Sequence, residues 1–442
     1  MKLWDKGQPI DKKIEEFTIG KDKEIDPLLA KWDVIGSLAH CKMLSKIGLL
    51  GVEEEKQISE ELKIIYNELA EGKVLSIEDG IEDIHSQVEL ILTRKLGDIG
   101  KKIHSGRSRN DQVLTDLKLF FRDSIKNMAE QVRGLFTTLQ ELSETHKDTL
   151  MPGYTHMQVA MPSSFGMWFG SYAESLSDDM HMLLAAFRIS NQNPLGSAAG
   201  YGSSFPLDRE YTTRLLGFAS QSYNSAYAQM GRGKTEKTLA FAMAGVAATI
   251  GKMAMDICLY NGQNFGFFKF PDELTTGSSI MPHKKNPDVF ELIRAKSNKI
   301  MALPYEISLI TGNLPAGYHR DLQVIKENVF PTITELLSCL DIMNYAIKQI
   351  QINKEIVNDP KYDYLFTVEE VNKKVLEGKP FRDAYKEVGI KVNSGNYTPD
   401  KTIHHTHDGS IGNLCNGEIK HKMEKVYKQF RFEEIDQTLE QL

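Results

Sequence analysis

Apolar side chains recur every three or four residues along most of this chain, the spacing of one face of an α-helix. The first run starts at Leu28 and keeps one apolar face through Trp32, Ile35 and Met43. No alternating apolar and polar run of strand length appears before residue 106. The pattern therefore predicts an all-α protein, with further helices over about 53–70, 86–92, 114–142, 163–188, 233–260, 287–312 and 321–351.

Several of these predicted helices reach about 25 to 30 residues, well above the usual helix length in globular proteins. Long helices expose long apolar stripes, and association with further copies of the chain covers them. After residue 351 the helices become shorter and the loops longer. We therefore expect three domains: an N-terminal helical domain at 1–105, a central long-helix bundle at 106–351 and a small C-terminal helical domain at 352–442.

Charge and cysteine content narrow the possible roles. The net charge of −7 argues against nonspecific nucleic-acid binding, although it leaves room for a local cationic pocket. Four scattered cysteines without a CxxC pair indicate reduced thiols in a cytosolic protein. The N-terminus shows no apolar secretory segment. The most apolar run, at 239–251, is rich in Ala and Gly and too short to span a bilayer, so we expect a tightly packed buried helix.

The stretch at 277–288, Gly-Ser-Ser-Ile-Met-Pro-His-Lys-Lys-Asn-Pro-Asp, ends in the features of a helix start. Asn286 fits the N-cap, Pro287 fits the first helical position, and Asp288 complements the positive helix end. The preceding residues form a loop that brings hydroxyls and lysines to a helix N-terminus, which suits an anionic substrate. A solvated basic loop that only caps the helix is the alternative. The composition also suits a lid that is mobile without ligand.

Two further loops carry side chains suited to chemistry. Arg107 and Arg109 flank a Gly-Ser turn and make a natural clamp for carboxylate or phosphate, although Arg107 with Asp111 is a plausible structural pair. The glycines around them do not match a P-loop or a dinucleotide fingerprint. A loop predicted at 151–162 carries His156, which is well placed for acid–base work, while a lone loop histidine is more often structural.

Two other segments have structural explanations of equal or greater weight. Gly36-Ser37 inside the first long helix lowers helix stability, and close helix packing explains such a pair as well as a functional role does. Residues 82–89 place acidic side chains at a helix start and set His85 and Glu89 on one face, an arrangement typical of a capped helix.

These segments together resemble the argininosuccinate lyases of the aspartase/fumarase superfamily. Residues 277–288 are similar to the superfamily signature loop, which we take as 275–288. The sequences HSGRSRNDQ and PGYTHMQ are similar to the other two shared regions. Residues 191–210 and 318–327 resemble argininosuccinate lyases more closely than their relatives. The resemblance covers the chain to about residue 330 and is weaker beyond it.

The resemblance implies a homotetramer whose central helices form a core of about 20 helices, with each active site taken from three subunits. It implies an enzyme that eliminates fumarate from argininosuccinate to give arginine, the last step of arginine biosynthesis. It further implies a cytoplasmic protein with no metal ion, no organic cofactor, and no nucleic-acid or membrane partner.

The implied chemistry is an anti elimination, in which a proton leaves the carbon beside a carboxylate and the dianionic aci-carboxylate needs preorganised donors. The resemblance implies Ser278 and His156 as the acid–base pair and leaves open which of them is the base. It implies that Glu291 pairs with His156, and that Lys284 and Asn286 stabilise the developing charge. The substrate-binding residues implied by the resemblance are Ser37, Arg109, Asn110, Thr155, Tyr318, Gln323 and Lys326.

Two departures from the family pattern concern substrate contacts. His283 stands where argininosuccinate lyases usually have glutamine and is similar to the residue of adenylosuccinate lyases, so adenylosuccinate lyase is the alternative enzyme. Residues 231–234 replace a Ser-Asp-Arg-Asp type of sequence. A catalytically silent structural homologue is the alternative outside enzymes.

Some of the polar residues have ordinary structural roles as alternatives. For Arg109 and Lys326 the alternative is a salt bridge, and for Tyr318 and Gln323 it is core or surface polarity. The histidines His404, His405 and His407 permit a metal site, but we favour a solvated or hydrogen-bonded group.

Overall fold

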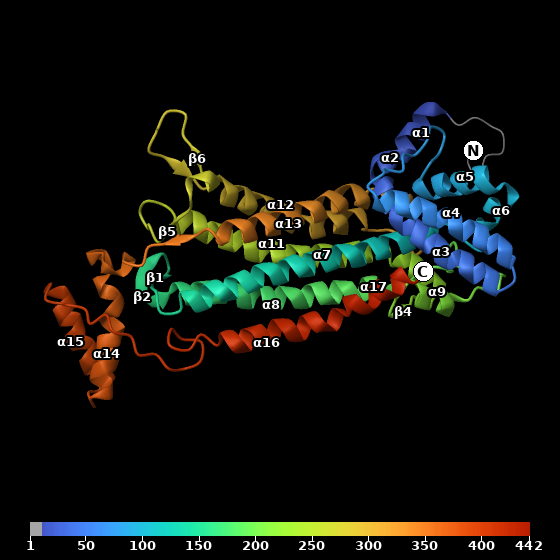
Figure 1. Ribbon diagram of the computed structural model, residues 1–442. Helices are drawn as coiled ribbons and strands as arrows, with labels where there is room; N and C mark the ends of the chain where they lie inside the picture. The colour runs from blue at the N-terminus through green and yellow to red at the C-terminus, as the bar shows by residue number, and fades with distance from the viewer. Residues whose placement is uncertain (1–10) are drawn as a thin grey trace.

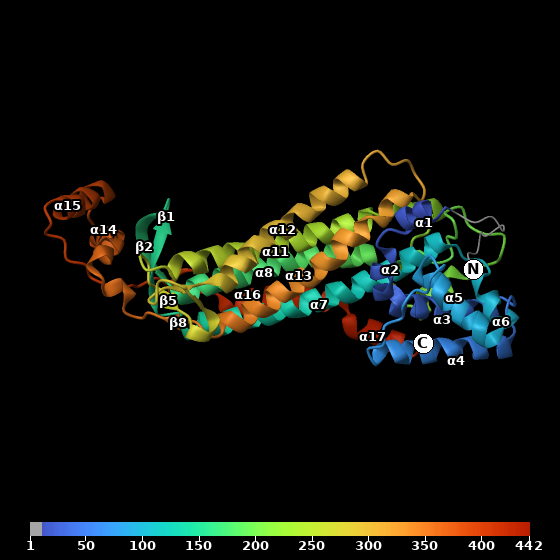
Figure 2. The same ribbon diagram turned by 90° about the horizontal axis from the view of Figure 1, so that it is seen from above.

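Five long helices form the body of the protein in the computed structural model, which describes residues 11–442. They lie side by side as an elongated bundle (Figure 1), and Figure 2 shows the same bundle from above. This arrangement confirms the predicted all-α class, while the predicted lack of a secretory segment concerns residues 1–10, outside the described range. The five helices are α7 (Arg109–Thr145), α8 (Phe165–Ser190), α11 (Lys234–Tyr260), α12 (Asp288–Ile310) and α13 (Ile325–Ile347).

The longest helix, α7, follows from its capping residues and its apolar spacing. Ser108 Oγ accepts the N–H of Asn110 at 3.3 Å, and Asp111 Oδ1 accepts the N–H of Ser108 at 2.9 Å. The helix then continues for 37 residues and buries one face, including Leu117 and Phe121. At 1.5 Å per residue this is a length of ~55 Å, so α7 alone connects the two ends of the bundle.

Three helices gather at one end of the bundle, beside the start of α7 (Figure 1). They are α3 (Ala30–Lys46), α4 (Val52–Ala70) and α5 (Ile84–Leu96). A Cβ added at Gly36 in α3 would lie 3.5 Å from Thr115 Cγ2 in α7, so the two helices leave little room beyond a methyl group. The added methyl group would make an ordinary van der Waals contact, so packing against α7 does not by itself require glycine at this position. The remaining short helices are α1 (Lys12–Ile19), α2 (Asp22–Ile25), α6 (Asp98–Lys101), α9 (Arg209–Leu215) and α10 (Ser225–Met230).

Short strand pairs occur where the sequence predicted loops. The stretch at 151–162 forms an antiparallel hairpin of β1 (Leu150–Thr155) and β2 (Gln158–Ser164), so the loop predicted there is wrong. Proline and glycine are depleted in strands, which is why the pattern did not show them. A second pair, β6 (Thr276–Gly277) with β7 (Lys285–Asn286), lies inside the signature loop. The other two-residue strands are β3 (Gln192–Asn193), β4 (Ser220–Gln221), β5 (Phe268–Lys269) and β8 (Gln351–Ile352).

Helix α11 contains the most apolar part of the chain. Among residues 11–442 it is the one helix whose length and composition would let it cross a membrane, and 56% of its most apolar window is buried inside the structure. It packs against α12 and α8. A Cβ added at Gly251 would lie 2.8 Å from the Cβ of Ser297 in α12. These contacts confirm the tight packing predicted for 239–251, but burial is one-sided, because Phe241 is 52% exposed.

The chain leaves the bundle after α13. Helices α14 (Thr367–Leu376) and α15 (Phe381–Asn393) lie at the end of the molecule opposite α3 (Figure 1). They pack on each other around a small apolar cluster of their own, formed by Val371, Ala384 and Val388. This pair is the part of the C-terminal region that is separate from the main core.

The chain then returns along the bundle. Helices α16 (Asn416–Tyr427) and α17 (Phe432–Glu440) run back beside α8 towards the N-terminal helices (Figure 1). The last residue is tied to α3, where Lys42 Nζ donates to the backbone oxygen of Leu442 at 2.7 Å. The domain boundary expected at 352 stays a proposal, and this packing favours a smaller separate unit around α14 and α15.

Candidate active site

A pocket of about 220 Å³ lies where α2, the start of α5 and the start of α7 meet the segment before α13. We call it the N-terminal pocket. Residues from distant parts of the sequence line it, because the helix bundle brings the start of α7 beside the turn that precedes α13. Five of the seven residues predicted to bind substrate line this pocket: Arg109, Asn110, Tyr318, Gln323 and Lys326.

Arg109 lies at the first position of α7 and is already paired. Its Nη1 lies 2.7 Å from Glu82 Oε2, its Nε lies 3.2 Å from Asp83 Oδ2, and its Nη2 donates to Ser86 Oγ at 2.7 Å. The salt bridge considered as an alternative is therefore present. The fork is held rigidly at the pocket wall, where a planar guanidinium suits a carboxylate.

Lys326 lies buried between two carboxylates. Its Nζ lies 2.7 Å from Asp22 Oδ1 and 2.5 Å from Asp26 Oδ1, so here too the alternative salt bridge is present. Burial raises the pKa of Asp22 to about 6, although the charge of Lys326 acts in the opposite direction. Two acids against one lysine leave this corner of the pocket close to neutral or negative without a ligand.

The other three predicted substrate-binding residues in the pocket differ in the hydrogen bonds that their side chains already make. Gln323 donates from Nε2 to the backbone oxygens of Thr18 at 3.2 Å and Ile19 at 3.0 Å. Tyr318 Oη accepts from Arg232 Nη1 at 3.2 Å. The amide of Asn110 makes no side-chain hydrogen bond to residues 11–442. Asn110 is therefore the lining residue most available to a ligand.

Ser37 is buried behind the pocket and is not among its lining residues. Its Oγ accepts from Arg107 Nη1 at 2.9 Å. The predicted pair of Arg107 with Asp111 is therefore wrong at the level of hydrogen bonds. Asp111 instead accepts the backbone N–H groups of Ser108, Gly196 and Ala198, each at 2.9 Å. Burial raises the pKa of Asp111 to about 6.

A buried histidine that lines the pocket, His85, was interpreted from the sequence only as part of a capped helix start. His85 Nδ1 lies 2.7 Å from Asp33 Oδ1 and 3.4 Å from Asp116 Oδ2, and all three side chains are buried. Burial alone lowers the pKa of His85, but the charges of Asp33 and Asp116 raise it to about 10. The three ligand atoms are also close enough to hold a metal ion. A protonated imidazole satisfies the same carboxylates, and no sequence pattern links positions 33, 85 and 116.

The signature loop lies at the other end of the bundle, as the β6–β7 hairpin (Figure 1). Ser278 Oγ accepts the N–H of Ile280 at 3.3 Å and of Met281 at 3.0 Å. Lys284 is exposed. Asn286 belongs to β7 and its Nδ2 donates to Thr276 Oγ1 at 3.3 Å, so the predicted N-cap is wrong by one residue. The helix follows Pro287, and Asp288 lies in its first turn as predicted.

His156 forms the tip of the β1–β2 hairpin at the same end. Thr155 pairs with Gln158, so His156 and Met157 make a two-residue turn. Their φ angles are 52° and 60°, a left-handed pair that glycine and asparagine favour. Thr155 and His156 are both exposed. Holding a bulky residue in this conformation stores strain, which is common at functional sites.

Glu291 lies in the first turn of α12 and is exposed. Its nearest cation is Arg294, at 3.9 Å. Within residues 11–442 no hydrogen bond or ion pair joins Glu291 to His156, the partner implied for it. The structure therefore divides the predicted residues into two groups at opposite ends of the bundle, separated by the length of α7.

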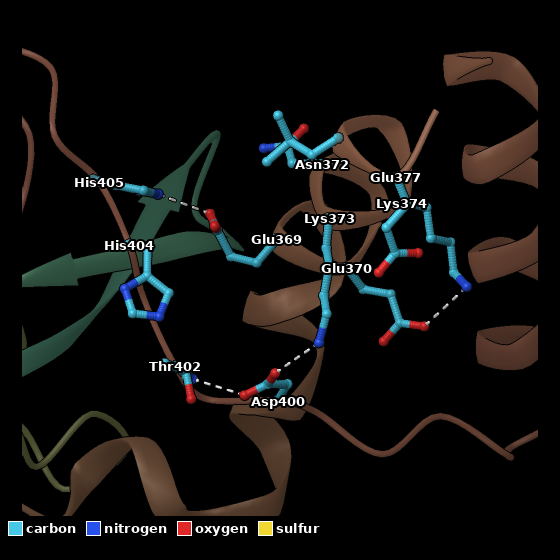
Figure 3. Close-up of a pocket in the computed structure, with 11 residues that line it drawn as sticks. Glu369, Glu370, Asn372, Lys373, Lys374, Glu377, Asp400, Thr402, His404 and His405 are labelled. Carbon is cyan, nitrogen blue, oxygen red and sulfur yellow. Dashed lines mark hydrogen bonds and ion pairs between the residues drawn. The ribbon is translucent and has the colours of Figure 1, made fainter. Parts of the chain in front are cut away.

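Two of the C-terminal histidines, His404 and His405, line a separate pocket of about 650 Å³ beside α14 (Figure 3). His405 Nε2 is 3.0 Å from Glu369 Oε1, and His407 Nδ1 is 3.1 Å from the backbone oxygen of Asp408. The favoured hydrogen-bonded group is confirmed for these two. Figure 3 also shows Lys373 directed to Asp400, so the lining is a mixture of paired charges.

The fold is shared with lyases of known structure. EDDS lyase in complex with formate superposes with a TM-score of 0.77 at 22% identity, over 98% of this chain and 94% of that chain. A class II fumarase from Schistosoma mansoni gives a TM-score of 0.66 at 16% identity, over 87% and 91%. In sequence, residues 6–302 match the protein family described as Lyase. The bundle and this match define the broad class as a lyase.

Proteins with similar sequences narrow the broad class of lyases to one family. The argininosuccinate lyase of Phocaeicola vulgatus is 61% identical over 437 residues, which cover 99% of this chain and 98% of the relative. That of Parabacteroides distasonis is 59% identical over 441 residues, 100% and 99% of the two chains. That of Thermotoga neapolitana is 39% identical over 390 residues, 88% and 98%. The chain belongs to the argininosuccinate lyase family.

Proposed function

We propose that this protein eliminates fumarate from argininosuccinate and releases arginine, as the last step of arginine biosynthesis. The observation that carries the proposal is the convergence of five predicted substrate-binding residues on the N-terminal pocket. Asn110 supplies an unengaged amide, whereas Arg109 and Lys326 reach a substrate carboxylate only by exchanging part of their pairing with the pocket's own carboxylates. The names of the relatives at about 60% identity support the same substrate.

Ser278 and His156 carry the proton transfers. One takes the proton from the carbon beside the carboxylate, and the other protonates the leaving guanidinium nitrogen, directly or through water. A serine hydroxyl is a weak base and acts as an alkoxide only when its charge is stabilised. The two backbone N–H groups that already point to Ser278 Oγ supply part of that stabilisation.

The developing negative charge falls on the substrate carboxylate. Lys284 and Asn286 stabilise the aci-carboxylate, helped by the positive end of α12, which starts directly after them. Glu291 orients His156 and raises its basicity once the two come together. Thr155 and Ser37 act as the remaining substrate contacts, Ser37 through a rearrangement of its bond to Arg107.

The complete site forms in a cytoplasmic homotetramer. A single chain keeps the N-terminal pocket and the signature loop apart, so antiparallel neighbours are needed to unite them. Exposed apolar side chains along α11 and α12, among them Phe241, Leu292, Tyr305 and Leu309, offer the surface for this association. Each site then takes its groups from three subunits.

Fumarate release, followed by ultraviolet absorbance, tests the proposal with argininosuccinate and adenylosuccinate offered separately. Turnover of argininosuccinate alone is the expected result and makes His283 a tolerated variation. Turnover of adenylosuccinate alone contradicts the substrate assignment. No turnover of either by a folded tetramer contradicts the enzyme and favours a silent structural homologue.

A further inference from the structure

The turn that carries His156 lies at the end of the β1–β2 hairpin, outside the packed core. Residues 155–159, which form the turn and the strand ends beside it, are all exposed. Tyr154, the residue before them in β1, is half-buried and pairs with Val159 in β2. The side chain of Tyr154 is therefore the last one before the turn that packs into the protein.

An irregularity in β1 directly precedes Tyr154. The register of the hairpin shifts between Pro152 and Tyr154, at Gly153. A Cβ added at Gly153 would lie 2.6 Å from the backbone oxygen of Met161 in β2, so only glycine fits here without a shift of the strands. Irregularities of this kind change the direction of the side chains beside them. The strand thus has a built-in feature that sets the direction of the Tyr154 side chain.

Aromatic rings surround the side chain of Tyr154. Its ring centroid lies 5.4 Å from that of Phe265 and 6.2 Å from that of Phe267, both in the connection after α11. Phe267 is fully buried and stacks on Tyr260 at the end of α11, with the two centroids 4.9 Å apart. Aromatic pairs at these distances stabilise a structure beyond the area that they bury. The hairpin is therefore packed, through Tyr154, on the end of α11.

A tyrosine from the C-terminal part of the chain completes this contact. Tyr362 lies in a short 3₁₀ helix, Pro360–Phe366, directly before α14, and both strands of the hairpin contact this helix. Tyr362 is fully buried, and its ring lies edge-on to Phe267 at 6.2 Å. Its Oη accepts a hydrogen bond from Tyr154 Oη at 3.3 Å. The hydroxyl pair thus joins the hairpin to the segment that leads into α14.

We propose that Tyr154 and Tyr362 are positioning residues that hold the β1–β2 turn, and with it His156, in place for proton transfer. The inference rests on the proposed function, which makes His156 one of the two proton-transfer groups. His156 lies two residues beyond Tyr154, at about 3.3 Å per residue, so a small change in the tilt of the hairpin displaces the imidazole. A displacement of about 1 Å costs about 100-fold in rate.

The experiment removes the anchoring ring with Tyr154→Leu. Tyr154→Phe is the conservative variant, which keeps the ring contacts and loses only the hydrogen bond to Tyr362. Phe187→Leu is the matched control, because its ring packs on Phe430 and Phe432, each at 5.3 Å, and lies about 33 Å along α8 from the hairpin. Fumarate release from argininosuccinate gives kcat and KM for each protein.

The expected result is that Tyr154→Leu lowers kcat by about 100-fold and changes KM less than about 2-fold, because the N-terminal pocket lies at the opposite end of the bundle. Tyr154→Phe restores kcat to within about 10-fold of the unsubstituted protein, since the ring contacts remain. Phe187→Leu lowers the melting temperature but keeps kcat within about 2-fold. Equal losses of kcat in Tyr154→Leu and Phe187→Leu, or an unchanged kcat in Tyr154→Leu, overturn the proposal.

A second set of variants covers the case in which Tyr154→Leu does not fold. Tyr154→Phe and Tyr362→Phe each remove the same hydrogen bond, so each should lower kcat by about 3-fold or more. The double variant should lower kcat no further than either single variant, because the two residues act through one bond. Losses of kcat that multiply in the double variant overturn the proposal.

A failure of the proposed function has a different signature. If the unsubstituted protein releases no fumarate from argininosuccinate, the function fails, and hydrogen exchange of the backbone amides at 150–164 then tests the anchoring of the turn alone. Faster exchange of these amides in Tyr154→Leu than in Phe187→Leu supports the anchor. Equal exchange in the two variants overturns it.

Discussion

The two ends of this molecule differ in how their polar side chains are buried and bonded. At the N-terminal pocket the polar side chains are buried or half-buried and are held by ion pairs, as in Arg109 with Glu82 and Lys326 with Asp26. At the opposite end, the signature loop and the β1–β2 turn carry exposed side chains whose bonds stay local, as in Asn286 with Thr276, and Ile280 is 83% exposed. Under the proposed function, the binding groups are preorganised within one chain, whereas the reacting groups are completed by surfaces of other chains.

Under the proposed function, one end of the bundle orients the substrate and the other end supplies the groups that transfer protons. Rigid ion-paired walls fix the orientation of a substrate, which requires precise geometry. The proposed role of the signature loop, to bring Ser278 and Lys284 to the substrate, is compatible with a loop whose hydrogen bonds stay within the loop itself. Substitutions of the paired residues at one end should therefore change stability and affinity, while substitution of the proposed reacting groups at the other should change turnover.

The largest effect is expected at the exposed end. Ser278→Ala should lower kcat by about 10³-fold or more, because no other hydroxyl replaces the proton-transfer group. The melting temperature should stay unchanged, since the bonds of Ser278 Oγ within residues 11–442 are to its own loop. Ser279→Ala is the matched control and should retain activity. A fall in melting temperature equal to that of a core variant would show that the loop is structural.

The next largest effect is a loss of stability at the N-terminal pocket, where the charged side chains are ion-paired. Lys326→Met should lower the free energy of unfolding by about 4 kcal/mol, because it leaves Asp22 and Asp26 buried without a cation. Denaturant unfolding measures this change. Lys21→Met removes an exposed ion pair, 3.5 Å from Glu327, and should cost under about 1 kcal/mol. Equal costs for the two variants would contradict the contrast between buried and exposed charge.

His85 makes the stability of the protein depend on pH. Its pKa is raised to about 10 from an ordinary value of about 6.5, so its contribution to stability is complete below about pH 6.5 and is lost as pH rises to about 10. His85→Gln should cost about 3 kcal/mol at pH 6, and the cost should shrink towards pH 10. Unfolding curves across this range measure it, with His104→Gln as control. A cost independent of pH would show that His85 is neutral.

The smallest expected effect is a gain in stability at the β1–β2 turn. Met157 is held at a φ of 60°, so Met157→Gly should raise the free energy of unfolding by about 1 kcal/mol. Val159→Gly, two residues along in β2, should lower it instead, because glycine weakens a strand. Thermal unfolding separates the two signs. A loss of stability in Met157→Gly would mean that the turn is not strained.

The helices could be predicted because each buries one apolar face over many turns, so the spacing of positions such as Leu117 and Phe121 carries the signal. The β1–β2 hairpin could not, since its strands contain Pro152 and Pro162 and its turn lacks the usual Asn-Gly. The cap at Asn286 was misassigned because pairing with β6 competes for that residue, an interaction outside the local pattern.

Apart from Arg109, which the local pattern already indicated as part of a clamp, the pocket residues were predicted from the family resemblance. Residues 109 and 326 are far apart in sequence, and only the packing of α13 beside α7 brings them together. The cluster of Asp33, His85 and Asp116 was not predicted for the same reason, because its three residues lie on three different helices. In physical terms, periodicity reports which face of a helix is buried, but it does not report which helices meet.

The central claim is that the two ends act together only between different copies of the chain. Ser278→Ala removes the reacting hydroxyl at one end, and Asn110→Leu removes a pocket amide that bonds to no other side chain in the described structure. Each variant alone should be a folded, inactive tetramer. The measurement is fumarate release after the two variants are dissociated, mixed in equal amounts and reassembled. The account predicts recovery of about a quarter of the normal activity, because one site in four then receives both intact groups from different chains. A reassembled mixture that stays inactive would contradict the account.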